Sequence, residues 1–280
     1  MKLSNILKFP IPLKKIKITG GEPLVRKDAI VLIRKLKKIS GITNVTITTN
    51  GVLLEQYYDD LIDAGIDAIT VSLDTMKRDI YQKITRRDEL ERVLRGIEKA
   101  IRENKVRLKI NCVCVTGIET QDILSLLNYA EYADVDIRFI EMMPIGLGKQ
   151  FPFVSEEAIR KVIEEKYGKL TPYVKTRGNG PCKYYDVPGF IGKVGFISAV
   201  SHKFCDTCNR VRLTSDGFLK TCLQYDYGVY LKSLLEQKAS DGILWEAMKT
   251  AIEQKPKAHH FDEKKIKSED EIRGMSQIGG

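Results

Sequence analysis

The chain has 280 residues, a net charge of +9 and a hydrophobic content of 43%, which is enough to bury a sizeable core. This composition excludes a wholly disordered protein, and no apolar run is long enough to span a bilayer. The first residues also lack the apolar stretch and cleavage site of a signal peptide. We therefore expect a soluble, cytoplasmic protein without a membrane partner. Because the lysines are scattered without interleaved aromatic residues, we expect no nucleic-acid partner either.

Residues 1–148 repeat a short apolar run followed by a pattern typical of an amphipathic helix. The runs are rich in Ile, Val and Thr and predict five strands: Lys15–Thr19, Asn44–Thr49, Ala68–Asp74, Arg107–Val115 and Asp136–Met143. The periodicity between them predicts four helices: roughly Ala29–Ile39, Leu53–Ala64, Leu90–Glu103 and Ile123–Ala133. This alternation predicts parallel βαβ units, in an open sheet or a barrel-like curve, with ligands at the C-terminal ends of the strands.

The pattern changes after Gly148, and we predict a second, smaller α+β domain over residues 149–280 beside a core domain over residues 1–148. A Gly- and Pro-rich stretch covers Arg177–Pro188. The other predicted elements are a helix, two short strands and two more helices: Ser155–Tyr167, Val194–Ala199, Val211–Thr214, Tyr230–Gln237 and Ile243–Gln254.

Three cysteines have the spacing of a metal site. Cys205 and Cys208 are separated by two residues, and Cys222 follows a short hairpin. A zinc ion would require a fourth ligand, which Cys182 or His202 could supply. An iron–sulfur cluster bound by three thiolates would instead keep one iron open to another ligand. The spacing alone leaves both metals possible.

Cations accompany these cysteines and the predicted strands. Arg210 and Arg212 have strand-like spacing, and two guanidinium groups beside a metal centre suit a polyphosphate. Lys109 lies within a predicted strand, where a lysine is costly unless it meets an anion. The alternatives are two exposed arginines on an edge strand and a strand edge that leaves Lys109 solvated.

Other polar or small residues lie at the ends of the predicted strands. Gly20 and Gly21 form a turn that lets a ligand approach the backbone closely, although an ordinary βα turn has the same residues. Met143 suits core packing equally well. Cys112 and Cys114 alternate within a strand, which favours small buried hydrophobic side chains.

These motifs together resemble one enzyme family. The segment Ile18–Leu24 resembles the GGEP turn of radical S-adenosylmethionine (SAM) proteins, and Phe204–Leu223 resembles the second-cluster motif of the GTP 3′,8-cyclases. The terminal Gly279–Gly280 pair resembles that family's double-glycine tail, which reaches into the active site. The resemblance implies a partial (β/α) barrel of the radical SAM type with a small C-terminal domain. It also implies cyclisation of GTP to 3′,8-cyclo-7,8-dihydro-GTP, a lyase reaction of molybdenum cofactor biosynthesis.

The resemblance also assigns ligand-binding positions, but no catalytic residue. The expected GTP contacts are Lys17, Thr48, Lys109, Arg210 and Arg212. The expected SAM contacts are Gly21, Ser72 and Met143. The expected ligands of a [4Fe-4S] cluster are Cys205, Cys208 and Cys222. Lys17 stands where the family has an arginine, so the charge is kept and the bidentate fork is lost. The implied partners are GTP, a reductant protein, the downstream cyclic pyranopterin monophosphate synthase and a second copy of the chain in a homodimer.

The sequence departs from the family at its start. The family carries a CxxxCxxC motif for its first [4Fe-4S] cluster, whereas this chain has 19 residues before Gly20 and no such motif anywhere. We therefore expect an N-terminally truncated form of the enzyme that lacks its first βα unit. The alternatives are a non-catalytic or partner-dependent fragment that binds GTP and an iron–sulfur cluster, and a zinc-bound scaffold or nucleic-acid binder that uses the basic surface.

Overall fold

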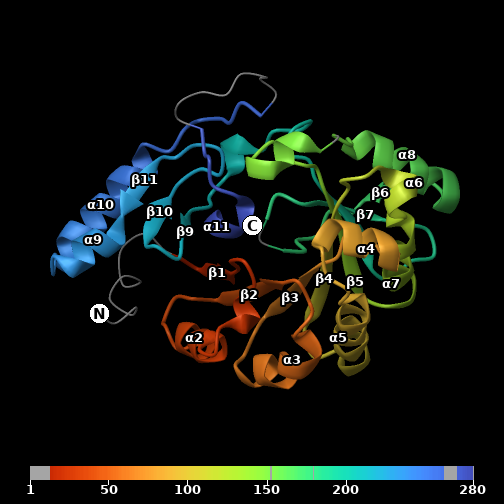
Figure 1. Cartoon of the computed structure of the whole chain (residues 1–280), viewed down its shortest axis with the longest axis horizontal. Helices are drawn as coiled ribbons and strands as arrows, with labels where there is room; N and C mark the ends of the chain where they lie inside the picture. Colours follow the sequence, from red (N-terminus) through yellow and green to blue (C-terminus); the bar gives the residue numbers. More distant parts are fainter. Residues whose placement is uncertain (1–12, 152, 179, 262–269, 280) are drawn as a thin grey trace.

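The structure, a computed structural model, describes residues 13–151, 153–178, 180–261 and 270–279. Its larger sheet has eight strands in the order β1-β2-β3-β4-β5-β8-β7-β6 (Figure 1). These strands are β1 (Lys15–Ile18), β2 (Asn44–Thr49), β3 (Ala68–Ser72), β4 (Arg107–Val113), β5 (Val135–Ile140), β6 (Thr171–Pro172), β7 (Lys183–Asp186) and β8 (Lys193–Ile197). The first five and β8 run parallel, and β7 and β6 add antiparallel strands.

Helices connect the parallel strands and cover one face of the sheet. They are α2 (Ala29–Lys37), α3 (Leu54–Asp63), α4 (Arg78–Thr85), α5 (Leu90–Glu103), α6 (Ile118–Gln121), α7 (Leu127–Tyr132) and α8 (Glu156–Tyr167), with 3₁₀ turns at Pro23–Val25, Ile123–Leu126 and Gly146–Gln150. Figure 1 shows α2, α3 and α5 side by side along this face. The mixed α/β class and the partial-barrel arrangement are confirmed. No helix among the described residues is long and apolar enough to cross a membrane.

Most predicted elements form, and the differences have local causes. The strand predicted to reach Asp74 ends at Ser72, and the Asp74 carboxylate accepts a hydrogen bond from the Val113 N–H at 2.8 Å. Beyond β4, Gln121 Oε1 accepts from the Val115 N–H at 2.7 Å, so that backbone group bonds a side chain instead of a neighbouring strand. The helix predicted from Ile123 begins instead as a 3₁₀ turn before α7.

The two faces of the parallel strands have opposite chemistry. One face carries buried aliphatic side chains, including Ile47, Ile69 and Ile110, which join the core under the helices. On the other face, Thr48 pairs in register with Thr70, and Thr70 pairs with Lys109. Parallel strands that are covered by apolar layers on both faces have no such alternation. The second face, called the polar face below, therefore borders a polar space.

The C-terminal part contributes to both sheets. Strands β6, β7 and β8 continue the larger sheet, whereas a smaller antiparallel sheet contains β9 (Arg212–Leu213), β10 (Phe218–Lys220) and β11 (Gly228–Tyr230). The remaining elements are the 3₁₀ turn η4 (Cys205–Thr207), α9 (Leu231–Glu236), α10 (Asp241–Glu253) and α11 (Met275–Ile278). Leu219, Leu231 and Met248 form a small core of their own. The division into domains at residue 148 stays a prediction.

Helices α3 and α5 meet closely at Gly96. A Cβ atom built at Gly96 would lie 2.9 Å from Leu54 Cβ, 3.2 Å from the Glu55 nitrogen and 3.3 Å from the Gly51 oxygen. These atoms belong to the backbone or lie next to it, so they cannot move aside as the end of a flexible side chain can.

Replacing Gly96 with alanine should therefore destabilise the protein, although alanine is the better helix former by about 1 kcal/mol. We expect Gly96→Ala to lower the free energy of unfolding by about 1–2 kcal/mol in urea denaturation, because overpacking costs more than the helix gains. Gly242→Ala is the matched control, since Gly242 also lies in a helix and a Cβ atom there would meet only Ser240 Oγ, at 3.9 Å. Equal or greater stability of Gly96→Ala would contradict the close contact.

Candidate functional site

Five cations gather at the polar face. Lys17 lies on β1, Lys109 on β4 and Arg138 on β5. Arg210 follows Cys208, and Arg212 is the first residue of β9. The positive charges of the other four all act on the Lys17 ammonium. The two sheets therefore bring together cations that are up to 195 residues apart (212 − 17) in the sequence.

The crowding changes the protonation of Lys17. Its side chain is open to solvent, yet protein atoms and four cations surround its ammonium. Desolvation first, and then repulsion from Arg138 and the other cations, lowers its pKa from 10.5 to about 7. The direction follows from the charges alone, since no anion contributes to this shift. An anion bound at this position would relieve the repulsion.

Lys109 is satisfied by the protein itself. Its ammonium donates to the Arg177 carbonyl at 2.8 Å and to the Tyr184 hydroxyl at 3.4 Å, and the Asp136 carboxylate lies 3.9 Å away. Burial, followed by the charge of Arg138, lowers the Lys109 pKa to about 8. The solvated-edge alternative is wrong, because Lys109 is buried and the anion it meets is Asp136. Its contact with GTP stays a prediction.

The Gly- and Pro-rich stretch, Arg177–Pro188, closes one end of the polar face, where the Arg177 carbonyl accepts a hydrogen bond from Lys109. The Arg177 side chain donates to Asp136 at 2.5 Å and also bonds Asp134. A cavity of about 330 Å³ is lined by residues of this stretch, including Cys182 and Tyr184, and by Arg138 on β5. Strand β7 lies within the stretch, and its Gly and Pro neighbours concealed it.

Arg138 and Asn111 were missed by the sequence analysis. Both lie on the polar face, where Ser72 pairs in register with Asn111 and Asn111 with Arg138. Arg138 donates to the Thr70 hydroxyl at 3.1 Å and is 7% exposed. Arg138 is a cation within a predicted strand, as Lys109 is, and this signal could have identified it.

Several buried polar atoms at the polar face have no hydrogen-bond partner among the described residues. They include Thr48 Oγ1, Asn111 Oδ1 and Arg138 Nε. A buried polar group without a partner costs about 1–3 kcal/mol. A polar ligand that supplied both donors and acceptors here would recover that free energy. Thr48 was among the expected GTP contacts, and its free hydroxyl fits that expectation.

The turn after β1 is fixed by Glu22. Its carboxylate accepts hydrogen bonds from the Leu24 N–H at 3.0 Å, the Thr49 hydroxyl at 2.8 Å and the Asn50 N–H at 2.6 Å. Gly20 has a φ of +147°, a conformation that favours glycine. A Cβ atom at Gly21 would meet nothing within 4 Å. The turn is therefore rigid in its backbone and open toward a ligand.

The other two expected SAM contacts differ in their surroundings. Ser72 is exposed at the C-terminal end of β3. Met143 is partly buried and packs against a small apolar cluster of Ile145, Phe261 and Ile278. Met143 thus makes the core-like contacts of the alternative interpretation, while its position after β5 is the one that the resemblance requires. Its role toward SAM stays a prediction.

The three cysteines lie beside the cation cluster. The charges of Cys208 and Cys222 both act on Arg212, whose pKa desolvation lowers to about 10. Lys255 donates to the Cys208 sulfur at 3.3 Å, and the His259 N–H donates to the Cys205 sulfur at 3.5 Å. All three cysteines are partly exposed and free.

Cys208 is electrostatically suited to bind a metal as a thiolate. Burial raises the pKa of its thiol, but a hydrogen bond from the Arg210 backbone and the charges of Arg210 and Lys255 outweigh it, so the pKa is lowered overall. Cys112 and Cys114 differ, because both are buried and desolvation raises the pKa of each thiol. The prediction that these two are small buried hydrophobic side chains is confirmed.

A site for a single metal ion does not form among the described residues. They contain no group of three or more His, Cys, Asp or Glu side chains that could hold such an ion. The fourth ligands considered for zinc have other neighbours. Cys182 lies beside Tyr184 and Arg138, and His202 Nδ1 lies 3.6 Å from Glu156.

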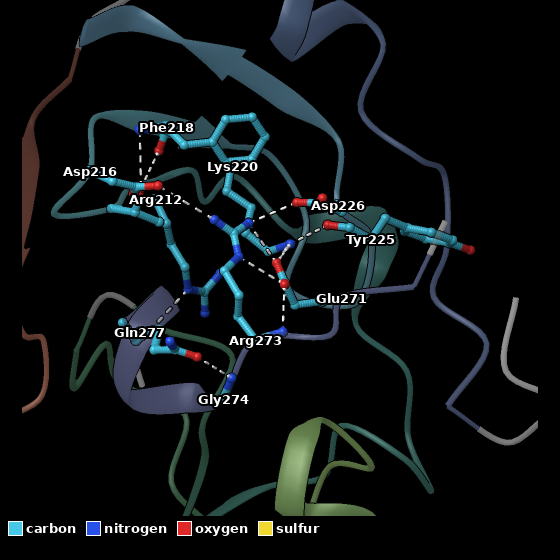
Figure 2. Close-up of polar contacts among 12 residues, drawn as sticks. Arg212, Asp216, Phe218, Lys220, Tyr225, Asp226, Glu271, Arg273, Gly274 and Gln277 are labelled. Atoms are coloured by element: carbon cyan, nitrogen blue, oxygen red, sulfur yellow. Dashed lines mark hydrogen bonds and ion pairs between the residues drawn. The ribbon is translucent and has the colours of Figure 1, made fainter. Parts of the chain in front are cut away.

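The C-terminal segment, defined here as residues 270–279, reaches Arg212 in the cation cluster (Figure 2). The Gly279 carbonyl accepts a hydrogen bond from Arg212 Nε at 3.3 Å. A Cβ atom at Gly279 would lie 3.3 Å from Thr19 Cγ2, at the end of β1. Gly280 lies outside the described residues. The described part of the double-glycine tail therefore contacts both the cation cluster and the turn at Gly20.

Comparisons with known proteins agree with this geometry. The Radical SAM superfamily matches residues 2–130, and the Molybdenum Cofactor Synthesis C family matches residues 135–261. The solved structure of Streptococcus suis SuiB bound to S-adenosylmethionine has a TM-score of 0.53 at 16% identity, covering 83% of this chain and 56% of that one. At this identity the likeness shows the fold alone.

Sequence relatives match over nearly the whole chain. A GTP 3′,8-cyclase of Clostridium perfringens is 43% identical, covering 100% of this chain and 87% of that protein. One from Petrotoga mobilis is 40% identical, covering 96% of this chain and 82% of that protein. Molybdenum cofactor biosynthesis protein 1 of Dictyostelium discoideum is 41% identical over 88% of this chain and 40% of that protein. The chain belongs to the GTP 3′,8-cyclase family, the radical SAM enzymes of molybdenum cofactor biosynthesis.

Proposed function

We propose that the chain binds GTP at the polar face and serves the 3′,8-cyclisation of GTP in molybdenum cofactor biosynthesis. The observation that carries this proposal is the meeting of the cations of β1, β4 and β5 with Arg210 and Arg212. Folding places these like charges close together, and their repulsion raises the free energy of the folded chain. A bound polyanion would offset that repulsion. Arg210 and Arg212 suit the triphosphate because a guanidinium group can donate two parallel hydrogen bonds to phosphate oxygens.

The buried polar atoms support an occupant larger than a simple phosphate. Thr48 can donate and accept a hydrogen bond, and Asn111 Oδ1 can accept one from an N–H or O–H group. A nucleoside offers such donors on its base and ribose. Inorganic phosphate lacks a base and a ribose, so it leaves these contacts to water.

Cys205, Cys208 and Cys222 would hold the [4Fe-4S] cluster of this site. The lowered thiol pKa of Cys208 and the nearby charges of Lys255 and Arg212 fit a negatively charged cluster. When bound through three thiolates, the cluster supplies one iron that is open to an atom of the guanine base. Lys255 fixes the cysteine turn, because it also donates to the carbonyls of Cys208 at 2.7 Å and Arg210 at 3.0 Å.

Gly21, Ser72 and Met143 would line the site for SAM. When bound, SAM supplies the radical chemistry that removes the C3′ hydrogen of GTP. The 280 residues contain no CxxxCxxC motif, so they offer no ligand set for the cluster that holds SAM in this family. We therefore derive no step through that cluster. Cyclisation then requires cysteine ligands from outside these residues, whereas GTP binding does not.

The other partners remain part of the proposal on the family resemblance alone. They are a reductant protein, the downstream cyclic pyranopterin monophosphate synthase and a second copy of the chain in a homodimer. A GTP-binding chain without catalysis of its own is the alternative function, and it shares the same GTP site.

Removing a guanidinium group from the cysteine segment should weaken GTP binding. We expect Arg210→Ala and Arg212→Ala each to raise the dissociation constant of GTP about 10- to 100-fold, as expected for the loss of charge-assisted hydrogen bonds. Equilibrium dialysis with labelled GTP, on anaerobically reconstituted chain without SAM, measures this directly. Arg95→Ala is the control, because Arg95 is an exposed arginine on α5. Equal weakening by the control, or none by either arginine variant, would contradict the proposed site.

GTP binding should take up protons near pH 8. In the free chain the pKa of Lys17 is about 7 and that of Lys109 about 8, so both lysines are partly neutral there. Bound triphosphate favours the charged ammonium and raises both pKa values, so affinity should fall as the pH rises from 7 to 9. Calorimetry at pH 8 in buffers of different ionisation enthalpy measures the uptake. In Lys17→Arg the uptake should shrink and the pH dependence flatten, because arginine stays charged. Unchanged uptake in that variant would show that Lys17 does not face the phosphates.

A further inference from the structure

A fully buried ion pair anchors the C-terminal segment to the smaller sheet. Lys220 on β10 and Glu271 have side chains that are 0% and 1% exposed, and their charged atoms lie 2.5 Å apart (Figure 2). The Lys220 ammonium also donates to the Tyr225 carbonyl. Burying two charges costs so much desolvation that such pairs are weak contributors to stability, and they are known to fix register. This pair therefore calls for a role other than stability.

Arg273 completes the anchor from its outer side. Its guanidinium donates to both Glu271 oxygens, at 2.9 and 2.8 Å, and to Asp226 at 2.7 Å. The guanidinium also lies over the Phe218 ring, 5.2 Å from its centre. Both Glu271 oxygens therefore accept hydrogen bonds from cations. Lys220 lies in the smaller sheet, and Arg273 lies in the same segment as Glu271.

Backbone contacts set the same register. The Glu271 N–H donates to the Gln224 carbonyl at 2.6 Å, and Asp270 forms an antiparallel bridge with Tyr225. His260 Nε2 lies 2.9 Å from the Asp270 carboxylate. A shift of the segment by one residue would remove Glu271 from Lys220 and leave a buried charge without its partner.

The far end of the segment contacts the residue beside Lys220. Lys220 and Arg212 are directly paired across β10 and β9. The segment leaves Lys220 at Glu271, turns through α11, buries Ile278 against Ile145 and returns to Arg212 through the Gly279 carbonyl. The C-terminal segment therefore bonds two cross-strand neighbours, Lys220 through Glu271 and Arg212 through Gly279. The spacing between its two contacts is fixed by the chain.

We propose that Glu271 is a positioning residue for the GTP site. Its carboxylate sets the register of the C-terminal segment on Lys220, so that Gly279 meets Arg212 and holds that guanidinium at the polar face. Glu271 acts through the segment and Arg212, and it does not touch the substrate. This inference rests on the proposed GTP site for its effect on affinity, whereas its effect on the segment can be measured without GTP.

Glu271→Gln tests the proposal, because it keeps the shape and removes the charge. We expect loss of amide hydrogen-exchange protection in the peptide that covers residues 274–279, and an approximately tenfold weaker affinity for GTP, about 1.4 kcal/mol. Both are measured on the full chain at a temperature where circular dichroism shows it folded. Asp226→Asn is the matched control, since Asp226 contacts Arg273 from the solvent side and leaves Glu271 bonded. It should change neither readout.

A purely structural role gives a different result. Reduced stability of Glu271→Gln, with wild-type exchange at 274–279 and wild-type GTP affinity in the folded protein, would overturn the proposal. If Glu271→Gln does not fold, two other variants replace it. The double variant Lys220→Met/Glu271→Gln removes both buried charges, and Arg273→Gln keeps the buried pair but removes the hydrogen bonds from Arg273 to Glu271. Loss of protection in either variant supports the anchor, and retained protection in both overturns it.

A double-mutant cycle shows whether the effect passes through the tail. Gly279→Val strains a position with a φ of +84° and should displace the carbonyl from Arg212. If Glu271 acts through the tail, adding Glu271→Gln to Gly279→Val should weaken GTP binding no further. Additive weakening would overturn the route through Gly279. If the wild type binds no GTP, the proposed function fails, while hydrogen exchange still decides whether Glu271 positions the segment.

Discussion

Repulsion among five cations at one face of a parallel sheet is the constraint on which the rest of the structure depends. Folding holds five cations together, although four of them repel Lys17, Arg138 repels Lys109 and Arg210 repels Arg212. Asp136 and its partner Arg177 satisfy the buried side of the group, and Lys109 bonds to them. Burial of the apolar core on the opposite face of the sheet stabilises the fold and offsets the repulsion among these cations. The positive charge at Lys17, which has no counter-ion among the described residues, faces the polar space, where a bound anion would neutralise it.

The two sheets contribute different parts of the site. The larger sheet brings Lys17, Thr48 and Asn111 to its polar face, and Glu22 fixes the adjoining glycine turn. The smaller sheet carries Arg212 beside the cysteines, and the C-terminal segment joins it to the end of β1. The site is therefore complete only when the C-terminal segment is in register, which links the buried pair of Lys220 and Glu271 to Arg212 at the polar face.

The sequence alone predicted most of the framework, because runs of Ile, Val and Thr and helical periodicity report local structure directly. It placed β1 to β5 correctly but predicted β3 and β4 too long. Asp74 and Gln121 accept hydrogen bonds there from backbone N–H groups that would otherwise pair with a neighbouring strand. Arg138 was overlooked in a run that also contains Asp136 and Glu141, although it is a cation within a strand just as Lys109 is. Strand β7 was hidden among glycines and prolines. The ion pair of Lys220 and Glu271 gave no signal, since its partners are 51 residues apart and each resembles an ordinary surface charge.

Spacing alone singled out the three cysteines as a metal site and the glycine turn as a ligand contact, whereas their cofactors and the role of the double-glycine tail came from the resemblance to the family; the structure adds the reason for their proximity. A crystal structure of the anaerobically reconstituted chain with GTP would test the central claim most directly. We expect triphosphate density at the polar face, within hydrogen-bonding distance of Lys17, Arg210 and Arg212. Density for GTP phosphates at another surface, with solvent among these cations, would contradict it.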